Sequence, residues 1–250
     1  MAGLCEGGND PPARPKKFSL IFSSAHLWSN GQRVWPRNQV GRVRIQVWAS
    51  YLVEFFPGFS LSPIRVNAGT FSTTRCRHPG CSETETLGHV LGFCKKGELL
   101  RNNRHHRART AIANLLRNRG WEVHEEIHCV SEDDSHRRVD IIAINRRTQK
   151  AMVLDPTICF ERDTNQALQI NDDKRAKYVP CLPYLSEKYG TSLYNWDVTG
   201  LLFGARGCLP KFTCDILKSF QIPFYEVQKI VMEILEASLQ ILHYHLYVNT

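Results

Sequence analysis

The stretch RRVDIIAINRRTQKAMVLDPTICFE, residues 137–161, decides the fold of this chain. It holds two apolar runs, RRVDIIAIN and KAMVLDPTICFE, which are separated by the polar tetrapeptide RRTQ. Apolar runs of this length, rich in β-branched residues, are typical of buried strands, and a short polar link between two of them is typical of a hairpin turn. We therefore expect two neighbouring strands that pair through a turn at RRTQ.

The sequence on either side of this hairpin predicts further strands and helices. WEVHEEIHCV before it and WDVTGLLFGARG after it favour strands. Residues 165–179 favour a helix that ends before Pro180, because proline disfavours the helical conformation of the residue before it. Residues 224–247 carry a regular polar stripe, which is typical of an amphipathic helix that covers a core. The sequence therefore predicts an α+β fold with a small mixed sheet flanked by helices.

A short cysteine-rich segment upstream of the strands has the spacing of a zinc site. The run CRHPGCSETETLGHVLGFC, residues 76–94, gives Cys-x4-Cys-x7-His-x4-Cys. Zinc binds four nitrogen and sulfur ligands in a tetrahedron, and short loops between ligands let one chain wrap a single ion. Pro79 and Gly80 supply turn residues between the first two cysteines. We predict a zinc knuckle with a structural Zn²⁺ held by Cys76, Cys81, His89 and Cys94.

Residues 98–119 follow the knuckle and predict a strongly basic helix. Apolar residues from Ala108 to Leu116 recur at helical spacing, and Gly120 supplies a helix stop. The segment carries six arginines against one acid, Glu98. Because a solvated helix face usually mixes charges of both signs, this excess indicates contact with the phosphates of a nucleic acid. The arginines assigned to that contact are Arg101, Arg104, Arg107 and Arg109.

Composition and charge limit the classes of protein to which the chain can belong. It has 250 residues, 42% of them hydrophobic, so it can bury the core of one large domain or two small ones. The formal net charge of +8 indicates a polyanionic partner, DNA or RNA. The sequence has no signal peptide, no membrane span and no Gly-rich phosphate loop. Nine cysteines without a disulfide pattern favour a reducing intracellular compartment, nuclear or cytoplasmic.

Two aspartates accompany the paired apolar runs. Asp140 interrupts the first run, and Asp155 is expected to end the apolar strand MVLD in the second. Carboxylates on adjacent strands can hold a divalent cation, which activates a water and stabilises the charge on a scissile phosphate. One strand-end aspartate is usually a turn former, but here the pair precedes a basic helix with Lys174 and Lys177. The pattern therefore indicates a catalytic metal site.

The order of these pieces resembles a known family. The knuckle and the arginine-rich helix are followed by GWEVHEE, RRVDIIAI, MVLDPTICFE and KRAKY. This order is similar to the C-terminal part of non-LTR retrotransposon polyproteins, which carry a Cys-Cys-His-Cys knuckle and then a restriction-like endonuclease of the PD-(D/E)xK superfamily. The resemblance covers residues 74–210, over half of the chain. It implies a restriction-endonuclease-like fold that cleaves DNA with Mg²⁺.

The resemblance also implies a role for each acid. Asp140 would be the aspartate of the family's Pro-Asp pair, and Asp155 would be the second acid that binds Mg²⁺. Glu126, or Glu125, would be an outer metal ligand from the preceding strand. The sequence departs from the family at Val139, where the family usually has proline. That exchange changes backbone stiffness more than chemistry.

The catalytic lysine of this family stands on the helix after the second acid. By the resemblance it would be Lys174 or Lys177, with Tyr178 beside it. The lysine would orient the attacking water or stabilise the pentavalent phosphate. In the broader superfamily the second acid is followed by any residue and then by the lysine. Here Pro156 and Thr157 follow Asp155 instead. This departure is expected if the lysine has moved to the helix.

The predicted organisation has five segments. They are a flexible basic leader at 1–17, an unassigned region at 18–75, the knuckle at 76–97, the nuclease-like domain at 98–222 and the amphipathic helix at 223–250. No reverse-transcriptase core fits in this length, so the chain looks like a stand-alone piece of an element. Two functions remain open: a metal-dependent DNA endonuclease and, alternatively, an inactive zinc-knuckle protein that binds nucleic acid.

Overall fold

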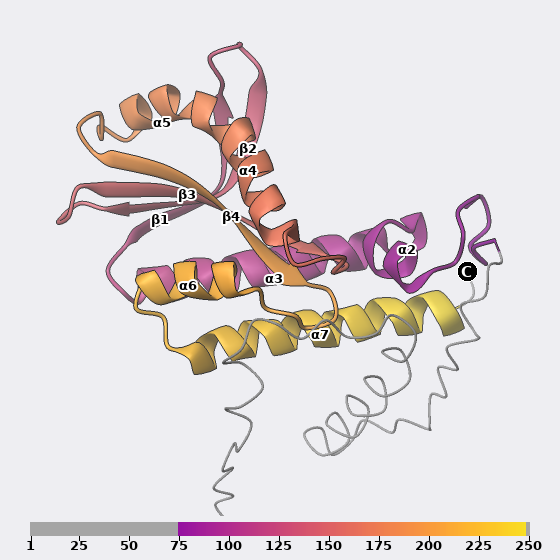
Figure 1. Cartoon of the computed structure of the whole chain (residues 1–250). Coiled ribbons are helices and arrows are strands. Elements are labelled where there is room, and N and C mark those ends of the chain that lie inside the picture. Colours follow the sequence, from indigo (N-terminus) through magenta and orange to yellow (C-terminus); the bar gives the residue numbers. More distant parts are fainter. Residues whose placement is uncertain (1–74, 249–250) are drawn as a thin grey trace, which may run out of the picture. The chain divides into compact units, whose positions relative to one another are not determined.

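A four-stranded mixed sheet forms the centre of the computed structural model, which describes residues 75–248 (Figure 1). The strands are β1 (Glu122–Val130), β2 (His136–Asn145), β3 (Lys150–Cys159) and β4 (Asn195–Gly204), in the sheet order β1-β2-β3-β4. The first three strands are antiparallel, and β4 runs parallel to β3. The predicted hairpin at RRTQ is confirmed, because Asn145 pairs with Lys150 across it.

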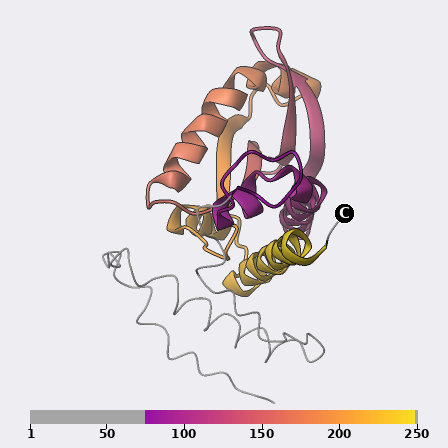
Figure 2. The same ribbon diagram turned by 90° about the vertical axis from the view of Figure 1, so that its right-hand side faces the viewer.

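Helices cover both faces of this sheet (Figures 1 and 2). The α-helices are α2 (Leu87–Gly92), α3 (Glu98–Arg117), α4 (Gln166–Tyr178), α5 (Leu182–Lys188), α6 (Lys211–Ser219) and α7 (Phe224–Tyr247). Single 3₁₀ turns, η3 (Lys95–Gly97) and η4 (Val179–Cys181), precede α3 and α5. The predictions for α3, α4 and α7 are confirmed, whereas α2, α5 and α6 were not predicted. The predicted leader at 1–17 and the unassigned region up to residue 74 lie outside the described residues.

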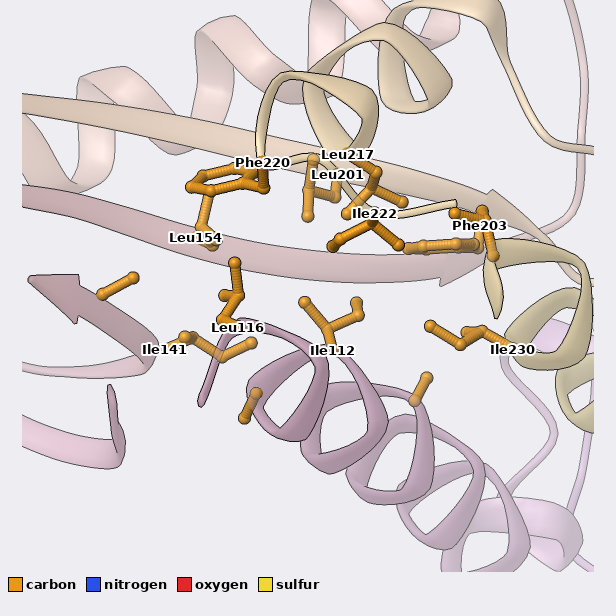
Figure 3. Packing of buried hydrophobic residues seen from close by; sticks show 14 of the residues in the cluster. Ile112, Leu116, Ile141, Leu154, Leu201, Phe203, Leu217, Phe220, Ile222 and Ile230 are labelled. Carbon is orange, nitrogen blue, oxygen red and sulfur yellow. The ribbon is translucent and has the colours of Figure 1, made fainter. Parts of the chain in front are cut away.

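The larger core lies on the face of the sheet that α3, α6 and α7 cover. Ile141 of β2 and Leu154 of β3 are fully buried there and meet Leu116 from α3 (Figure 3). Leu217 from α6 and Ile230 from α7 belong to the same cluster. Full burial of one such side chain contributes about 1.5–3 kcal/mol. This core fixes α3 and α7 on the sheet.

The opposite face packs against α4 and α5. Ile142 of β2 and Val153 of β3 point there, as the two-residue repeat of a strand requires. They share a cluster with Tyr178 at the end of α4 and Leu185 in α5, all of them buried. The result is a small mixed sheet between two layers of helices. This confirms the predicted α+β class.

The third strand continues past Asp155, which corrects one expectation. Asp155 was expected to end its strand, but β3 runs on to Cys159 because this part pairs with β4. Pairing with β2 stops at Ile141 and Leu154, so β3 is an edge strand on that side from there on. Pro156 has no N–H to donate, and an edge tolerates it. Asp155 therefore lies at the point where β2 and β3 separate.

The C-terminal helix packs along the molecule as a covering element. α7 buries one stripe of side chains that includes Val227, Ile234 and Ile241, and its polar stripe faces outward. Its contacts are mainly with α3. Within residues 75–248, none of the helices combines the length and the apolar character that a membrane crossing needs.

Candidate functional site

The four predicted zinc ligands come together in the structure. Cys76, Cys81, His89 and Cys94 are buried, and their ligand atoms all lie within 4.8 Å of one another. The sulfurs of Cys76 and Cys94 are 3.7 Å apart, and the Cys81 sulfur is 3.5 Å from His89 Nε2. Zinc–sulfur bonds of about 2.3 Å in a tetrahedron place two sulfurs about 3.8 Å apart. The cluster therefore has the dimensions of a zinc site.

Local backbone structure places these ligands. Gly80 has φ +82°, which a glycine adopts without strain, and the Cys81 N–H donates to the His78 carbonyl at 3.1 Å, closing the predicted turn. Thr86 caps α2, because its hydroxyl accepts from the His89 N–H at 3.1 Å. The turn holds the first two ligands together, and the capped helix presents His89 to them.

A histidine from the far end of the chain also reaches the knuckle. His245 on α7 is buried, and its Nε2 lies 3.2 Å from Glu85 Oε2 and 3.9 Å from Cys76 Sγ. Burial opposes the ionisation of Glu85, but hydrogen bonds from Arg77 hold the pKa of this carboxyl at about 2. Sequence reasoning gave His245 no role, because its only signal was its spacing from His243. In the structure it joins α7 to the zinc cluster.

The basic helix uses part of its charge inside the protein. Arg104 is buried and donates to Ser238 Oγ at 2.7 Å and to the Leu91 carbonyl at 3.0 Å. Arg109 is also buried and pairs with Glu125 at 3.1 Å and with Glu126. These two guanidinium groups are turned away from any phosphate outside the protein. Their burial does not favour the phosphate contacts predicted for Arg104 and Arg109, which stay predictions.

The other two predicted phosphate contacts are more accessible. The Arg107 side chain is 48% exposed, and its nearest acid, Glu233, lies 3.9 Å away. Arg101 is half-buried and donates to the Cys94 carbonyl. Arg101 therefore lies beside the zinc cluster, and Arg107 is the arginine of this set with the most open guanidinium group.

Three acids follow one another across the sheet. The pairs Glu125–Ile141 and Ile127–Val139 set Glu126 opposite Asp140 in the register of β1 and β2. Asp140 and Asp155 are the chain neighbours of Ile141 and Leu154, which form the last pair between β2 and β3. Asp155 contacts Lys174 and Tyr178 of α4, whereas Asp140 contacts His105 of α3. We call Glu126, Asp140 and Asp155 the acid row.

The outermost acid of the row has an unusual backbone. Glu126 has φ +56°, which is uncommon for a residue other than glycine and occurs often at functional sites. Its carboxylate is engaged by Arg109 and by Arg138. Within the described residues, the three carboxylates of the row do not bring three ligand atoms within 4.8 Å of one another. The role of Glu126 as an outer metal ligand stays a prediction.

The inner acid of the row contacts α4. Lys174 Nζ lies 2.8 Å from Asp155 Oδ1, and the Tyr178 hydroxyl lies 2.9 Å from Asp155 Oδ2. Lys177 is exposed, and its Nζ lies 4.7 Å from the centre of the Tyr178 ring. Of the two lysines that the sequence left open, Lys174 is the one in contact with Asp155.

A glycine lets α4 approach the acid row. Gly200 of β4 is the register partner of Asp155. A Cβ at this position would lie 2.9 Å from Lys174 Cγ and 3.0 Å from the Ile170 carbonyl oxygen. The Gly200 N–H also donates to Asn171 Oδ1 at 3.2 Å. The absent side chain therefore lets α4 bring Lys174 to Asp155.

The middle acid of the row contacts α3. His105 Nε2 lies 3.1 Å from Asp140 Oδ2 and 3.0 Å from the Pro156 carbonyl oxygen. Sequence patterns do not single out His105, because nothing in the run RHHR separates a buried histidine from a solvated one. The structure places it in the acid site.

The site perturbs the ionisation of its members. Burial opposes the ionisation of Asp140, but the hydrogen bond from His105 and the charge of Lys174 bring the pKa of this carboxyl below its usual value. The hydrogen bond to Asp140 raises the pKa of His105. Burial, together with the charge of Asp155, raises the pKa of Tyr178. The tyrosine hydroxyl therefore keeps its proton and donates to the carboxylate.

A groove of about 960 Å³ lies between the knuckle and residues at the end of β3 and the start of α4. Knuckle residues line one side, including Phe93, which is 75% exposed, and Lys95. Arg162, Thr157 and Ile170 belong to the other side. Along α4, Lys174 lies one turn beyond the last of these residues. The groove therefore reaches to within one helical turn of Lys174 along α4.

Comparisons with known proteins identify relatives of part of the chain. No protein-family model matches it. The chain is 30% identical over 150 residues to the retrovirus-related Pol polyprotein from type-1 retrotransposable element R2 of Popillia japonica, a match that covers 57% of this chain and 23% of the relative. A second protein with this description from the same organism is 32% identical over 136 residues, covering 53% of this chain and 27% of the relative.

A solved structure of a protein of unknown function, AF1548, aligns with 56% of this chain and 98% of its own, at 10% identity and a TM-score of 0.29. This likeness is too weak to carry an argument. The chain spans about a quarter of the length of the curated relatives it matches. Those relatives support an origin of this chain in a non-LTR retrotransposon.

Proposed function

We propose that this chain is a retrotransposon-derived endonuclease that cuts DNA with the help of Mg²⁺. The contacts of Asp155 carry the proposal. This buried carboxylate meets Lys174 at 2.8 Å and Tyr178 at 2.9 Å, and Asp155 and Asp140 lie next to the last pair between β2 and β3. Two acids on adjacent strands beside a lysine suit metal-dependent hydrolysis of a phosphodiester.

Each residue would have a distinct task in cleavage. Asp140 and Asp155 would hold Mg²⁺ between them, as one or two carboxylates commonly do when a phosphate supplies further ligands. Magnesium bound there would lower the pKa of a water and neutralise charge on the phosphate. Lys174 would orient the attacking water or stabilise the charged phosphate, while the Tyr178 hydroxyl holds Asp155 in place.

The same acids support a restriction-endonuclease-like assignment of the fold. In that assignment the sheet carries the acid row, α4 supplies the lysine and α3 covers the other face. Residues outside the row favour a nucleic-acid substrate. The groove offers an exposed Phe93 with Lys95 and Arg162 beside it, and aromatic and basic side chains together suit nucleic acid. Arg101 and Arg107 add charge on α3 near the knuckle.

The test is nicking of supercoiled plasmid DNA in Mg²⁺. We expect the wild-type protein to nick, and Asp140→Asn and Asp155→Asn each to slow nicking by more than about 100-fold. Asp173→Asn is the matched control, because Asp173 is an exposed acid on α4. The proposal fails if wild type and both site variants nick equally, or if none of them nicks.

A second function, nucleic-acid binding without cleavage, is favoured by one observation. The four zinc ligands bring their ligand atoms within 4.8 Å of one another, whereas the three carboxylates of the acid row do not. A protein of this kind would bind DNA or RNA with an affinity that falls steeply with salt and would never cut. Binding measured at several salt concentrations, beside the nicking assay, separates the two functions.

A further inference from the structure

His105 lies where the two inner strands of the acid site separate. It stands on α3, and its side chain is 30% exposed, against 16% for Asp140. Its Nε2 is 3.1 Å from Asp140 Oδ2 on β2 and 3.0 Å from the Pro156 carbonyl oxygen on β3. The last pair between these strands, Ile141 with Leu154, is next to both contacts. One imidazole nitrogen therefore joins the two strands just beyond their last pairing.

The two partners of this nitrogen determine what it must do. A backbone carbonyl and an ionised carboxylate can only accept hydrogen bonds. His105 Nε2 must therefore carry a proton and share it between them. This arrangement fixes Oδ2 of Asp140. The other oxygen, Oδ1, makes no hydrogen bond or ion pair within residues 75–248, so it is the oxygen that a cation could use.

The contact with Pro156 extends the effect to the second acid. Pro156 directly follows Asp155, and no β2 residue pairs with it. Without His105, the Pro156 carbonyl oxygen would lose its hydrogen-bond donor from α3. The Asp140 carboxylate would also lose the contact that keeps it from rotating. The neighbouring His106 offers no substitute, because its Nε2 lies 3.6 Å from Glu126 instead.

We propose that His105 is a positioning residue, which holds Asp140 and the strand segment after Asp155 so that the two aspartates can bind one divalent cation. The inference rests on the proposed function, because it concerns the same site. His105 does not touch the substrate or the reacting atoms in this role. It acts through Asp140, as residues that orient metal ligands do.

The experiment measures cation binding directly, in the zinc-loaded full chain. Mn²⁺ is titrated calorimetrically into wild type and into His105→Ala, His105→Gln and His105→Asn. We expect the Ala variant to bind Mn²⁺ about 10–100-fold more weakly. The Gln variant should bind nearly as tightly as wild type, because its amide nitrogen reaches the place of Nε2. The shorter Asn variant should bind as weakly as Ala.

His128→Ala is the matched control, because His128 is exposed on β1. The contrast between Gln and Asn keeps the test decisive if the Ala variant does not fold. Equal Mn²⁺ affinity in all His105 variants would overturn the inference, and so would a wild type that does not bind Mn²⁺.

Nicking assays separate this inference from the proposed function. If wild type binds Mn²⁺ in a way that depends on His105 but never nicks, the endonuclease proposal fails and the positioning role stands. If wild type nicks and the His105 variants need no more Mg²⁺ for half-maximal nicking, the positioning role fails and the endonuclease proposal stands. We expect a higher Mg²⁺ requirement in the Ala variant, with a similar rate at saturating Mg²⁺.

Discussion

At the scale of single residues, Lys174 and Lys177 differ in what surrounds them. Lys174 is partly buried and contacts Asp155 at 2.8 Å, whereas Lys177 is exposed on the neighbouring turn of α4. A buried ion pair that loses one partner leaves an uncompensated charge, while an exposed lysine is worth little to stability. The two positions should therefore respond very differently to the same substitution.

We predict that Lys174→Met removes nicking activity and that Lys177→Met retains it. The loss at Lys174 should be about 100-fold or more if this ammonium group stabilises the phosphate in the transition state. Nicking rates of the two variants, compared at equal DNA occupancy, give the answer. Similar losses in both variants would contradict the assignment of the catalytic lysine.

Sequence reasoning found residues that carry a local pattern and missed those whose partners are distant. The zinc ligands lie within 19 residues, and Asp140 and Asp155 interrupt a hairpin, so spacing alone reveals them. His105 meets a strand 35 residues away, and His245 meets the knuckle 169 residues away. No periodicity or spacing encodes such contacts, because they depend on how whole elements pack.

At the scale of elements, the long helices and the strands were predictable and the short helices were not. α3 and α7 span several turns, and their 3.6-residue pattern is clear over that length. α2 has six residues and α5 has seven, and packing against the rest of the fold stabilises such short helices more than their own sequence does. Buried Arg104 and Arg109 could not be foreseen, because charge alone does not say which side of α3 meets the protein.

The distance between α4 and β4 depends on Gly200. We predict that Gly200→Ala destabilises the fold by about 1–3 kcal/mol, because the new methyl group would press on the backbone of α4 at Ile170 and Asn171. Chemical denaturation measures the change. The same shift should weaken the contact of Lys174 with Asp155 and reduce nicking.

The control for this prediction is Gly92→Ala. Gly92 ends α2, and a Cβ there would meet no atom within 4 Å. We expect this variant to be as stable as wild type or slightly more stable. If Gly200→Ala proved equally harmless, close approach of α4 would not be what Gly200 provides.

At the scale of the whole molecule, knuckle, sheet and C-terminal helix belong to one compact unit. Composition and hydrophobic pattern were enough to predict an α+β class with a small mixed sheet. The parallel pairing of β3 with β4 was not predictable in the same way. It depends on α4 and α5 crossing over one face, which is a property of the packed chain.

We predict that the zinc cluster and α7 stabilise each other. His245→Ala should lower the free energy of unfolding by about 1–3 kcal/mol, because buried Glu85 loses a hydrogen bond. The variant should also release zinc to a chelator faster than wild type. Denaturation curves and a colorimetric zinc assay measure the two effects.

His243→Ala is the control, because His243 lies outside the buried stripe of α7 and its ring contacts Tyr247. We expect this variant to keep the stability and the zinc retention of wild type. Zinc release at the wild-type rate from His245→Ala would show that α7 only covers the knuckle.

The contact between Cys76 and His245 can form only late in the synthesis of the chain. All four zinc ligands leave the ribosome close together, but His245 follows Cys76 by 169 residues. At about 5–20 residues per second, its arrival takes roughly ten to thirty seconds more. During that interval the thiols of the nascent knuckle are present without α7, whose His245 contacts Cys76 in the finished protein. Early capture of zinc would be their protection from oxidation while the rest of the chain is made.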